Sequence, residues 1–261
     1  DLLTRDYISD QKFSISTIST TGVALTSTAS KKGGFSTGDV GAVYKYKNTI
    51  FDVKFDTDSN ILTTLTFAEV LPSTKTIASF KFPDFNNSGK LEFQYFHDHA
   101  TLTAAVATPQ SPSIDFSATI GTPAIAFGAE AGYDTASGSF TKYTACISVT
   151  KPDAYASITL GDKGDSIKAS YVHHVDQFKR SAAVAEISRK FSTNENTVTV
   201  GGSYAIDHLT LVKAKLNNYG KLGAVLQHEV IPNSLLTIAG EFDTKALDRT
   251  PRFGVAIALR P

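Results

Sequence analysis

The fold is decided by stretches such as Lys90-Leu-Glu-Phe-Gln-Tyr-Phe-His-Asp98, in which hydrophobic and polar residues alternate. One side of this stretch is hydrophobic and carries Leu91, Phe93 and Tyr95; the other is polar and carries Lys90, Glu92 and Gln94. Successive side chains of a β-strand point to opposite faces, so the alternation predicts a strand with one hydrophobic and one polar face. The same pattern occurs in Asn48–Asp56, Phe140–Val149 and Pro251–Leu259.

Short turn motifs separate these stretches, for example Lys32-Gly33-Gly34, Asp58-Ser59-Asn60 and Asp162-Lys163-Gly164. Glycine, asparagine and aspartate tolerate the positive φ angles that tight hairpin turns require. Divided at such motifs, the chain contains nineteen candidate strands between about Lys12 and about Leu259. Each strand with its turn has about 14 residues, which suits the roughly 9–11 residues of a tilted membrane strand. No linker interrupts the series, and we expect a single β-domain.

Composition narrows the class of protein. The chain has 25 basic and 25 acidic residues, so its net charge indicates no nucleic-acid partner. A single cysteine, Cys146, excludes an internal disulfide. No stretch reaches the roughly 18 consecutive apolar residues of a membrane-spanning helix. The chain contains no methionine and its first residues do not form a signal peptide, so we expect it to begin partway into the gene product.

The charged residues of the strand interiors all fall on the face opposite the hydrophobic one. Two all-β architectures fit this pattern. A soluble antiparallel sandwich, such as an adhesin or lectin-like binding protein, would bury the hydrophobic faces and expose the charges to water. A transmembrane barrel would turn the hydrophobic faces outward to lipid and the charges inward to a lumen.

Three features favour the barrel. The connections are uniformly short, whereas a sandwich of this size usually has longer loops. The hydrophobic faces are interrupted by small residues, as in Val198–Gly202, which suits contact with lipid better than a close-packed core. Hardly any strand is apolar on both faces, as expected for one closed layer. Because no backbone group can be left unpaired in hydrocarbon, the sheet must close. Nineteen is odd, so the first and last strands must pair in parallel.

Several motifs resemble those of the eukaryotic porins, the family of voltage-dependent anion channels, and are closest to its plant branch. They are Asp1-Leu-Leu-Thr-Arg-Asp-Tyr7, the turn Gly132-Tyr133-Asp134, Tyr204-Ala-Ile-Asp207 and Ala214-Lys-Leu-Asn-Asn218 with Gly223. The barrel of this family has nineteen strands, so the strand count above is not independent of the resemblance. His208 departs from the family signature, which prefers a small residue or proline there.

The resemblance implies a passive, voltage-gated pore of the mitochondrial outer membrane for ATP, ADP, phosphate and other small metabolites. It implies no enzyme activity and no cofactor. It also implies an N-terminal helix inside the lumen, of which residues 1–10 would be the end and the linker, followed by the barrel over residues 11–261. The partners expected are the lipid bilayer, transient nucleotides and small anions, with a homo-oligomer and cytosolic docking proteins as further possibilities.

The expected lumen contains more cations than anions. The strand interiors contribute ten cations and six anions, an excess of about four positive charges. Basic rings concentrate anions in a pore, so we predict a mild preference for anions that weakens as salt screens the lumen. The cations expected to line the pore or contact nucleotide phosphates are Arg5, Lys12, Lys45, Lys47, Lys54, Lys81, Lys90, Lys142, Lys168, Lys213, Lys215 and Arg252. The anions expected on the same face are Asp52, Glu92, Asp115, Glu130, Glu186 and Glu241.

The sequence does not decide which element moves when the pore closes. Charges that move across the membrane potential couple to it, and Asp1 and Arg5 in the N-terminal segment are the gating candidates. The lumenal lysines are an alternative, because a deforming wall would carry them instead.

Other constellations give weaker signals. His97 and His99 lie on one side of an expected strand, but no third metal ligand is suggested nearby, so we predict no metal site. Cys146 is expected to be an inert residue of the polar face. No phosphate-binding loop or nucleophile-elbow motif occurs, which weighs against a third possibility, an enzyme built on a membrane barrel.

Overall fold

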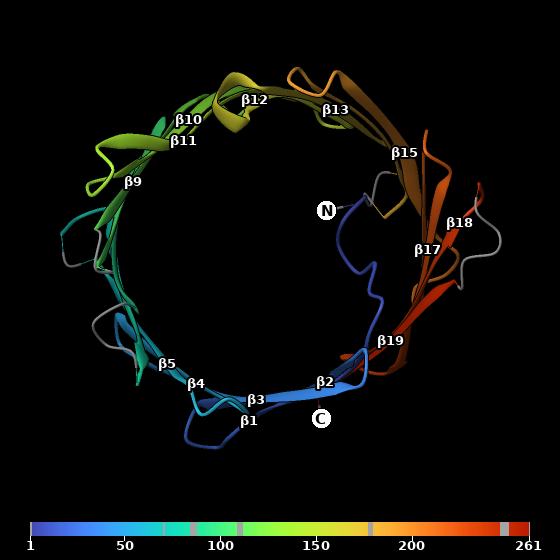
Figure 1. Cartoon of the computed structure of the whole chain (residues 1–261). Coiled ribbons are helices and arrows are strands. Elements are labelled where there is room, and N and C mark those ends of the chain that lie inside the picture. Colours follow the sequence, from blue (N-terminus) through green and yellow to red (C-terminus); the bar gives the residue numbers. More distant parts are fainter. Residues whose placement is uncertain are drawn as a thin grey trace.

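The computed structural model describes residues 2–69, 71–83, 88–108, 112–176, 180–245 and 251–260. These residues form a single ring of nineteen β-strands around an open centre (Figure 1). The first ten strands are β1 (Gln11–Ile18), β2 (Val23–Lys32), β3 (Phe35–Tyr46), β4 (Thr49–Asp56), β5 (Ile61–Ala68), β6 (Thr74–Phe82), β7 (Gly89–His97), β8 (Ala100–Thr108), β9 (Ser113–Gly121) and β10 (Ile125–Asp134). The others are β11 (Ser139–Thr150), β12 (Ala154–Gly161), β13 (Ser166–His174), β14 (Ala182–Lys190), β15 (Glu195–Ala205), β16 (Thr210–Asn217), β17 (Lys221–Ile231), β18 (Ser234–Asp243) and β19 (Arg252–Leu259).

Each strand pairs antiparallel with its neighbour in sequence, and the ring closes where β1 pairs with β19 in parallel. The parallel register runs from Gln11 opposite Val255 to Ile15 opposite Leu259. The expected nineteen strands, the closure and the parallel pair are therefore confirmed. A single closed layer has no second sheet, so the two-sheet sandwich is wrong.

The strand boundaries lie close to those expected from alternation. The stretch Asn48–Asp56 becomes β4, and Lys90–Asp98 becomes β7. A 3₁₀ turn, η1 (Asp162–Gly164), follows β12 at the predicted Asp162-Lys163-Gly164 turn. Among the residues that the structure describes, no helix is long and apolar enough to cross a membrane.

The N-terminal segment, Leu2–Asp10, lies inside the ring against the wall formed by β15 to β19 (Figure 1). Its location in the lumen agrees with the expectation, and the end of a helix before it, expected over Asp1 to about Arg5, stays a prediction. Leu2–Asp6 form turns, and Asp6 has a positive φ of 72°. A helix cannot continue through a left-handed residue, so the linker to the barrel begins there. The carbonyl oxygen of Leu3 accepts a hydrogen bond from Lys215.

Buried hydrophobic residues are few and do not form a central core. Among the described residues, those with the least exposure include Leu3 in the N-terminal segment and Val225 and Ala239 on the wall beneath it. Large hydrophobic side chains such as Phe51, Phe127 and Tyr143 are instead exposed. This distribution fits a membrane barrel, in which lipid rather than protein covers the hydrophobic face.

Candidate functional site

The contacts of the N-terminal segment identify the inner face of the barrel. Because this segment lies inside the ring, the side chains of Lys213 and Lys215, which bind it, point into the lumen. Residues directly opposite each other on paired strands share a face. Following the pairings from Lys213 around all nineteen strands and back again assigns one face of every strand to the lumen without contradiction.

These pairings place most of the charges expected in the lumen on one face of the sheet. Ten of the predicted cations and all six predicted anions share the inward face. Lys54 lies opposite Gly41 and Leu62, whereas its strand neighbours Val53 and Phe55 face outward. The inward cations are Lys12, Lys45, Lys54, Lys81, Lys90, Lys142, Lys168, Lys213, Lys215 and Arg252. Whether they contact nucleotide phosphates stays a prediction.

Two of the predicted cations, Lys47 and Arg5, lie outside the strands, and one gating candidate is not among the described residues. The alternation predicted Lys47 in a strand interior, but it lies in the turn between β3 and β4. Its ammonium group lies 5.5 Å from the centre of the Tyr46 ring. Arg5 belongs to the N-terminal segment and is largely exposed, with Nε 4.0 Å from a carboxylate oxygen of Asp6. Asp1 lies outside the described residues.

The inward face carries further charges near the strand ends. The expected excess of four cations did not include them, because it was based on strand interiors alone. The additional cations are Lys32, Lys75, Lys190 and Lys221. The additional anions are Asp39, Asp56, Asp134, Glu195, Glu229 and Asp243. The described strands therefore present fourteen cations and twelve anions to the lumen, an excess of two rather than the expected four.

These charges are unevenly distributed around the ring. Strands β1 to β6 carry six inward cations and three inward anions, whereas β7 to β19 carry eight and nine among the described residues. We call the inward lysines of β1 to β6 the basic arc: Lys12, Lys32, Lys45, Lys54, Lys75 and Lys81. The excess positive charge of the lumen is thus concentrated on one side.

Ion pairs neutralise more of the lysines outside the basic arc. Lys168 lies 3.1 Å from Glu186, Lys90 3.2 Å from Glu92, and Lys142 3.4 Å from Asp115. Within the arc, Lys32 lies 3.8 Å from Asp10. An ion pair reduces the field that a passing anion meets, so the arc is the part of the wall with the strongest positive field.

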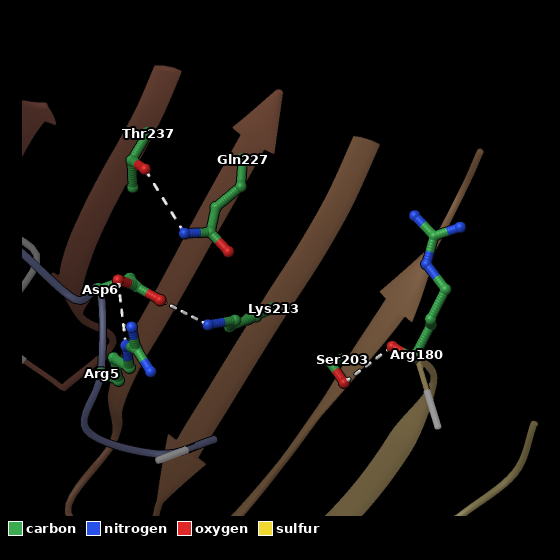
Figure 2. A network of polar contacts seen from close by, with 7 residues as sticks. All are labelled: Arg5, Asp6, Arg180, Ser203, Lys213, Gln227 and Thr237. Atoms are coloured by element: carbon green, nitrogen blue, oxygen red, sulfur yellow. Dashed lines mark hydrogen bonds and ion pairs between the residues drawn. The ribbon is translucent and has the colours of Figure 1, made fainter. Parts of the chain in front are cut away.

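The N-terminal segment is bound to the wall of β15 to β19 by two lysines of β16. Lys213 Nζ lies 2.6 Å from Asp6 Oδ2, and its side chain is only 9% exposed (Figure 2). Lys215 Nζ donates a hydrogen bond of 2.8 Å to the carbonyl oxygen of Leu3 and lies 3.9 Å from the centre of the Tyr7 ring. Beside them, Gln227 donates a hydrogen bond of 3.4 Å to Thr237 (Figure 2). We call the contacts of Lys213 and Lys215 with the segment the latch.

Inward glycines allow the segment to approach the wall closely. A Cβ atom at Gly201 would lie 2.8 Å from the Leu3 side chain, and one at Gly223 would lie 2.9 Å from the Tyr7 ring. At Gly254 a Cβ atom would collide with the carbonyl of Ile8. Real Cβ atoms do not come this close, so these positions admit the segment only because they lack side chains.

We predict that Gly223→Ala loosens the N-terminal segment. The added methyl group forces Tyr7 and Lys215 apart and costs about 1–2 kcal/mol of docking free energy, as overpacking does elsewhere. Amide hydrogen exchange of Leu2–Asp10, followed by mass spectrometry, should accelerate about tenfold. Gly128→Ala is the matched control, because it also faces the lumen but its Cβ would meet Thr119 at an ordinary 3.6 Å. Equal exchange in the two variants would contradict the prediction.

Tyr7 is the ionisable group of this site whose environment is most unusual. Burial raises the pKa of Tyr7 from 10.0 to about 12. Its buried hydroxyl group has no hydrogen-bond partner among the described residues. The docked segment therefore favours the neutral phenol.

We predict that docking of the segment is insensitive to pH below about pH 10 and is lost as the pH rises through about 12. The released tyrosine ionises at its usual pKa while the docked one does not, so rising pH favours release in this window. The difference in tyrosinate absorbance between the protein and Tyr7→Phe should have its midpoint near pH 12. A midpoint near pH 10 would show that Tyr7 is not buried.

The weaker constellations do not form sites. The rings of His97 and His99 lie 6.4 Å apart at the turn between β7 and β8. No group of three potential metal ligands occurs among the residues that the structure describes. Cys146 faces the lumen on β11, where its sulfur accepts a hydrogen bond of 3.2 Å from Thr159.

Comparison with known proteins gives a consistent result. The eukaryotic porin family matches residues 1–254. The chain is 71% identical, over its whole length and 94% of the relative, to mitochondrial outer membrane protein porin 2 of Arabidopsis thaliana. With the same coverage it is 62% identical to mitochondrial outer membrane protein porin 5 of Oryza sativa and 49% identical to the 34-kDa porin of Solanum tuberosum.

Proposed function

Because this chain belongs to the eukaryotic porin family, we propose that its lumen is a voltage-gated, weakly anion-selective pathway for ATP, ADP and phosphate. The protein is an integral β-barrel of the mitochondrial outer membrane and forms a pore for metabolites, and members of its family are channels rather than enzymes. The observation that carries the finer proposal is the basic arc, a group of inward lysines with few neighbouring carboxylates.

The anion preference is weak because most inward charge is balanced. An excess of two cations spread over a wide, hydrated lumen produces a small mean potential. Near the wall of the basic arc the potential is larger, and anions pass there in preference to the centre. The Debye length is about 8 Å at physiological ionic strength, so the preference should decrease as salt is added.

Voltage sensitivity is proposed to reside in the N-terminal segment. Moving one charge across the membrane potential changes the free energy by about 2.3 kcal/mol per 100 mV. Arg5 and Asp6 belong to this segment, and Asp1, outside the described residues, is a further candidate. The latch holds the segment with a few polar contacts rather than a large hydrophobic interface. The free energy of moving one charge across the membrane potential is therefore comparable with the free energy of these contacts.

Reconstitution in a planar bilayer tests the proposal. We expect stepwise conductance, closure at high voltage, and a reversal potential that favours chloride under a potassium chloride gradient. The preference should shrink when both solutions are concentrated at a constant ratio. A reversal potential that favours potassium would reject the anion selectivity, and conductance independent of voltage would reject the gating. Oligomers and cytosolic docking proteins stay predictions from the resemblance.

A further inference from the structure

The outward face of the barrel is almost free of formal charge. Among the strands that the structure describes, the pairings place two Asp, Glu, Lys or Arg residues on it, Lys31 of β2 and Arg189 of β14. Both lie next to the last residue of their strand, so they reach the surface region of the bilayer rather than its centre. Arg189 donates a hydrogen bond to Asn194 and lies over the Phe191 ring. No ion pair of Lys31 occurs among the described residues, and its side chain is exposed.

Lys31 is part of a polar row that crosses three strands near the barrel seam. Gln11 of β1 and Ser36 of β3 lie directly opposite Lys31 on either side, and all three face outward. An amide, an ammonium group and a hydroxyl group are thus side by side. This row can donate several hydrogen bonds to a phosphate group and supplies one positive charge.

An apolar row lies two residues deeper along the same strands. There Phe13 pairs with Ala29, Ala29 with Gly38, and Phe13 with Ile257 across the seam. With a rise of about 3.3 Å per residue, the two rows are about 7 Å apart. The small residues Ala29 and Gly38 leave the surface hollow between the larger side chains.

The two rows line a single groove. It has a volume of about 490 Å³ and is bordered by Gln11, Phe13, Ala29, Lys31, Ser36 and Ile257, among others. Its polar end lies towards the surface of the bilayer and its apolar end towards the hydrocarbon. This is the order of chemical groups in a glycerophospholipid, from phosphate headgroup to acyl chain.

We propose that the groove at the β19–β1–β2 seam binds one anionic glycerophospholipid, with its phosphate on Lys31, Gln11 and Ser36 and an acyl chain over Ala29. The charge of Lys31 selects an anionic lipid. The bound chain covers the parallel pair of β1 and β19, which comprises five residue pairs and is intrinsically less stable per residue than an antiparallel pair. The lipid therefore stabilises the closure of the ring.

Native mass spectrometry of the full chain, released from detergent in the presence of phosphatidylglycerol or phosphatidylcholine, tests the proposal. We expect one retained phosphatidylglycerol molecule, with affinity reduced about fivefold by Lys31→Gln, as for the loss of one lysine at a membrane surface. Lys31→Arg should retain the lipid. The matched control is Arg189→Gln, the other outward cation, which should leave the affinity unchanged. Equal losses in Lys31→Gln and Arg189→Gln would indicate non-specific attraction and overturn the proposal.

A second variant tests the acyl part of the groove. Ala29→Phe should fill the hollow and reduce lipid retention, whereas Ala169→Phe, at an outward alanine of β13, should not. Circular dichroism and unchanged single-channel conductance confirm that each barrel is folded, and they separate failure of this proposal from failure of the pore proposal. Displacement of the lipid by inorganic phosphate alone would indicate that the groove binds a free anion. A dimer cross-linked through the seam, without bound lipid, would indicate that a second copy of the chain occupies the groove. Either result would overturn the proposal.

Discussion

Asp6→Asn should release the N-terminal segment from the barrel wall. The substitution leaves the ammonium group of Lys213 almost buried without its carboxylate, because this lysine side chain is 9% exposed in the structure. Breaking a fully buried pair costs about 3–5 kcal/mol. Asp6 is 26% exposed and borders the water-filled lumen, so we expect about 2 kcal/mol, or roughly a 30-fold larger released population.

A spin label at Thr4→Cys, with Cys146→Ser to remove the native thiol, measures this release by electron paramagnetic resonance. The mobile fraction should increase in Asp6→Asn and in Lys213→Gln. Arg5→Gln is the matched control, since Arg5 is 70% exposed and its 4.0 Å contact with Asp6 is worth little. The combination of Asp6→Lys and Lys213→Asp should recover part of the docking. A mobile fraction that does not change in Asp6→Asn would show that the ion pair does not hold the segment.

Reversing three charges of the basic arc should invert the ion preference of the pore. Lys45→Glu, Lys54→Glu and Lys81→Glu together change the inward balance by six charges, from an excess of two cations to an excess of four anions. Potentials of about one kT at the wall alter local ion concentrations about threefold. The permeability ratio of chloride to potassium should therefore decrease by roughly threefold or more relative to the unmodified protein, to a value below one.

The reversal potential under a potassium chloride gradient measures this change, and its magnitude should decrease at high salt. The matched control reverses three lysines outside the strands, Lys47, Lys151 and Lys163. This control applies the same change in total charge without altering the inward wall. An equal shift in the two triple variants would show that selectivity follows net charge, and that the basic arc has no special role.

Much of the inward face was predictable because the signal is local. In Asn48–Asp56 the alternation alone assigns Phe51 to one face and Lys54 to the other, and the pairings confirm it. The errors occur where the alternation ends. Lys47 continues the pattern of β3 but lies in the turn, and Lys75 and Lys221 were missed because each lies at a strand end. Counting only interiors therefore overestimated the positive excess.

The latch could not be predicted from spacing. Asp6 and Lys213 are 207 residues apart, and the Leu3 carbonyl that binds Lys215 carries no sequence signal at all. The family resemblance placed a helix at the N-terminus, but the described residues form turns that follow the wall. The resemblance indicated where the segment lies, but not which contacts with the wall hold it.

The amino-acid sequence by itself determined that this protein is built of strands that each have one hydrophobic and one charged face. That information is contained in a two-residue repeat, which each strand expresses independently of its neighbours. The tertiary structure alone decided which lysines are neutralised, where the N-terminal segment rests and how Lys31 meets Gln11 across two strands. These features depend on the register between strands and on the closure of β1 with β19, and both bring together residues that are distant in the chain.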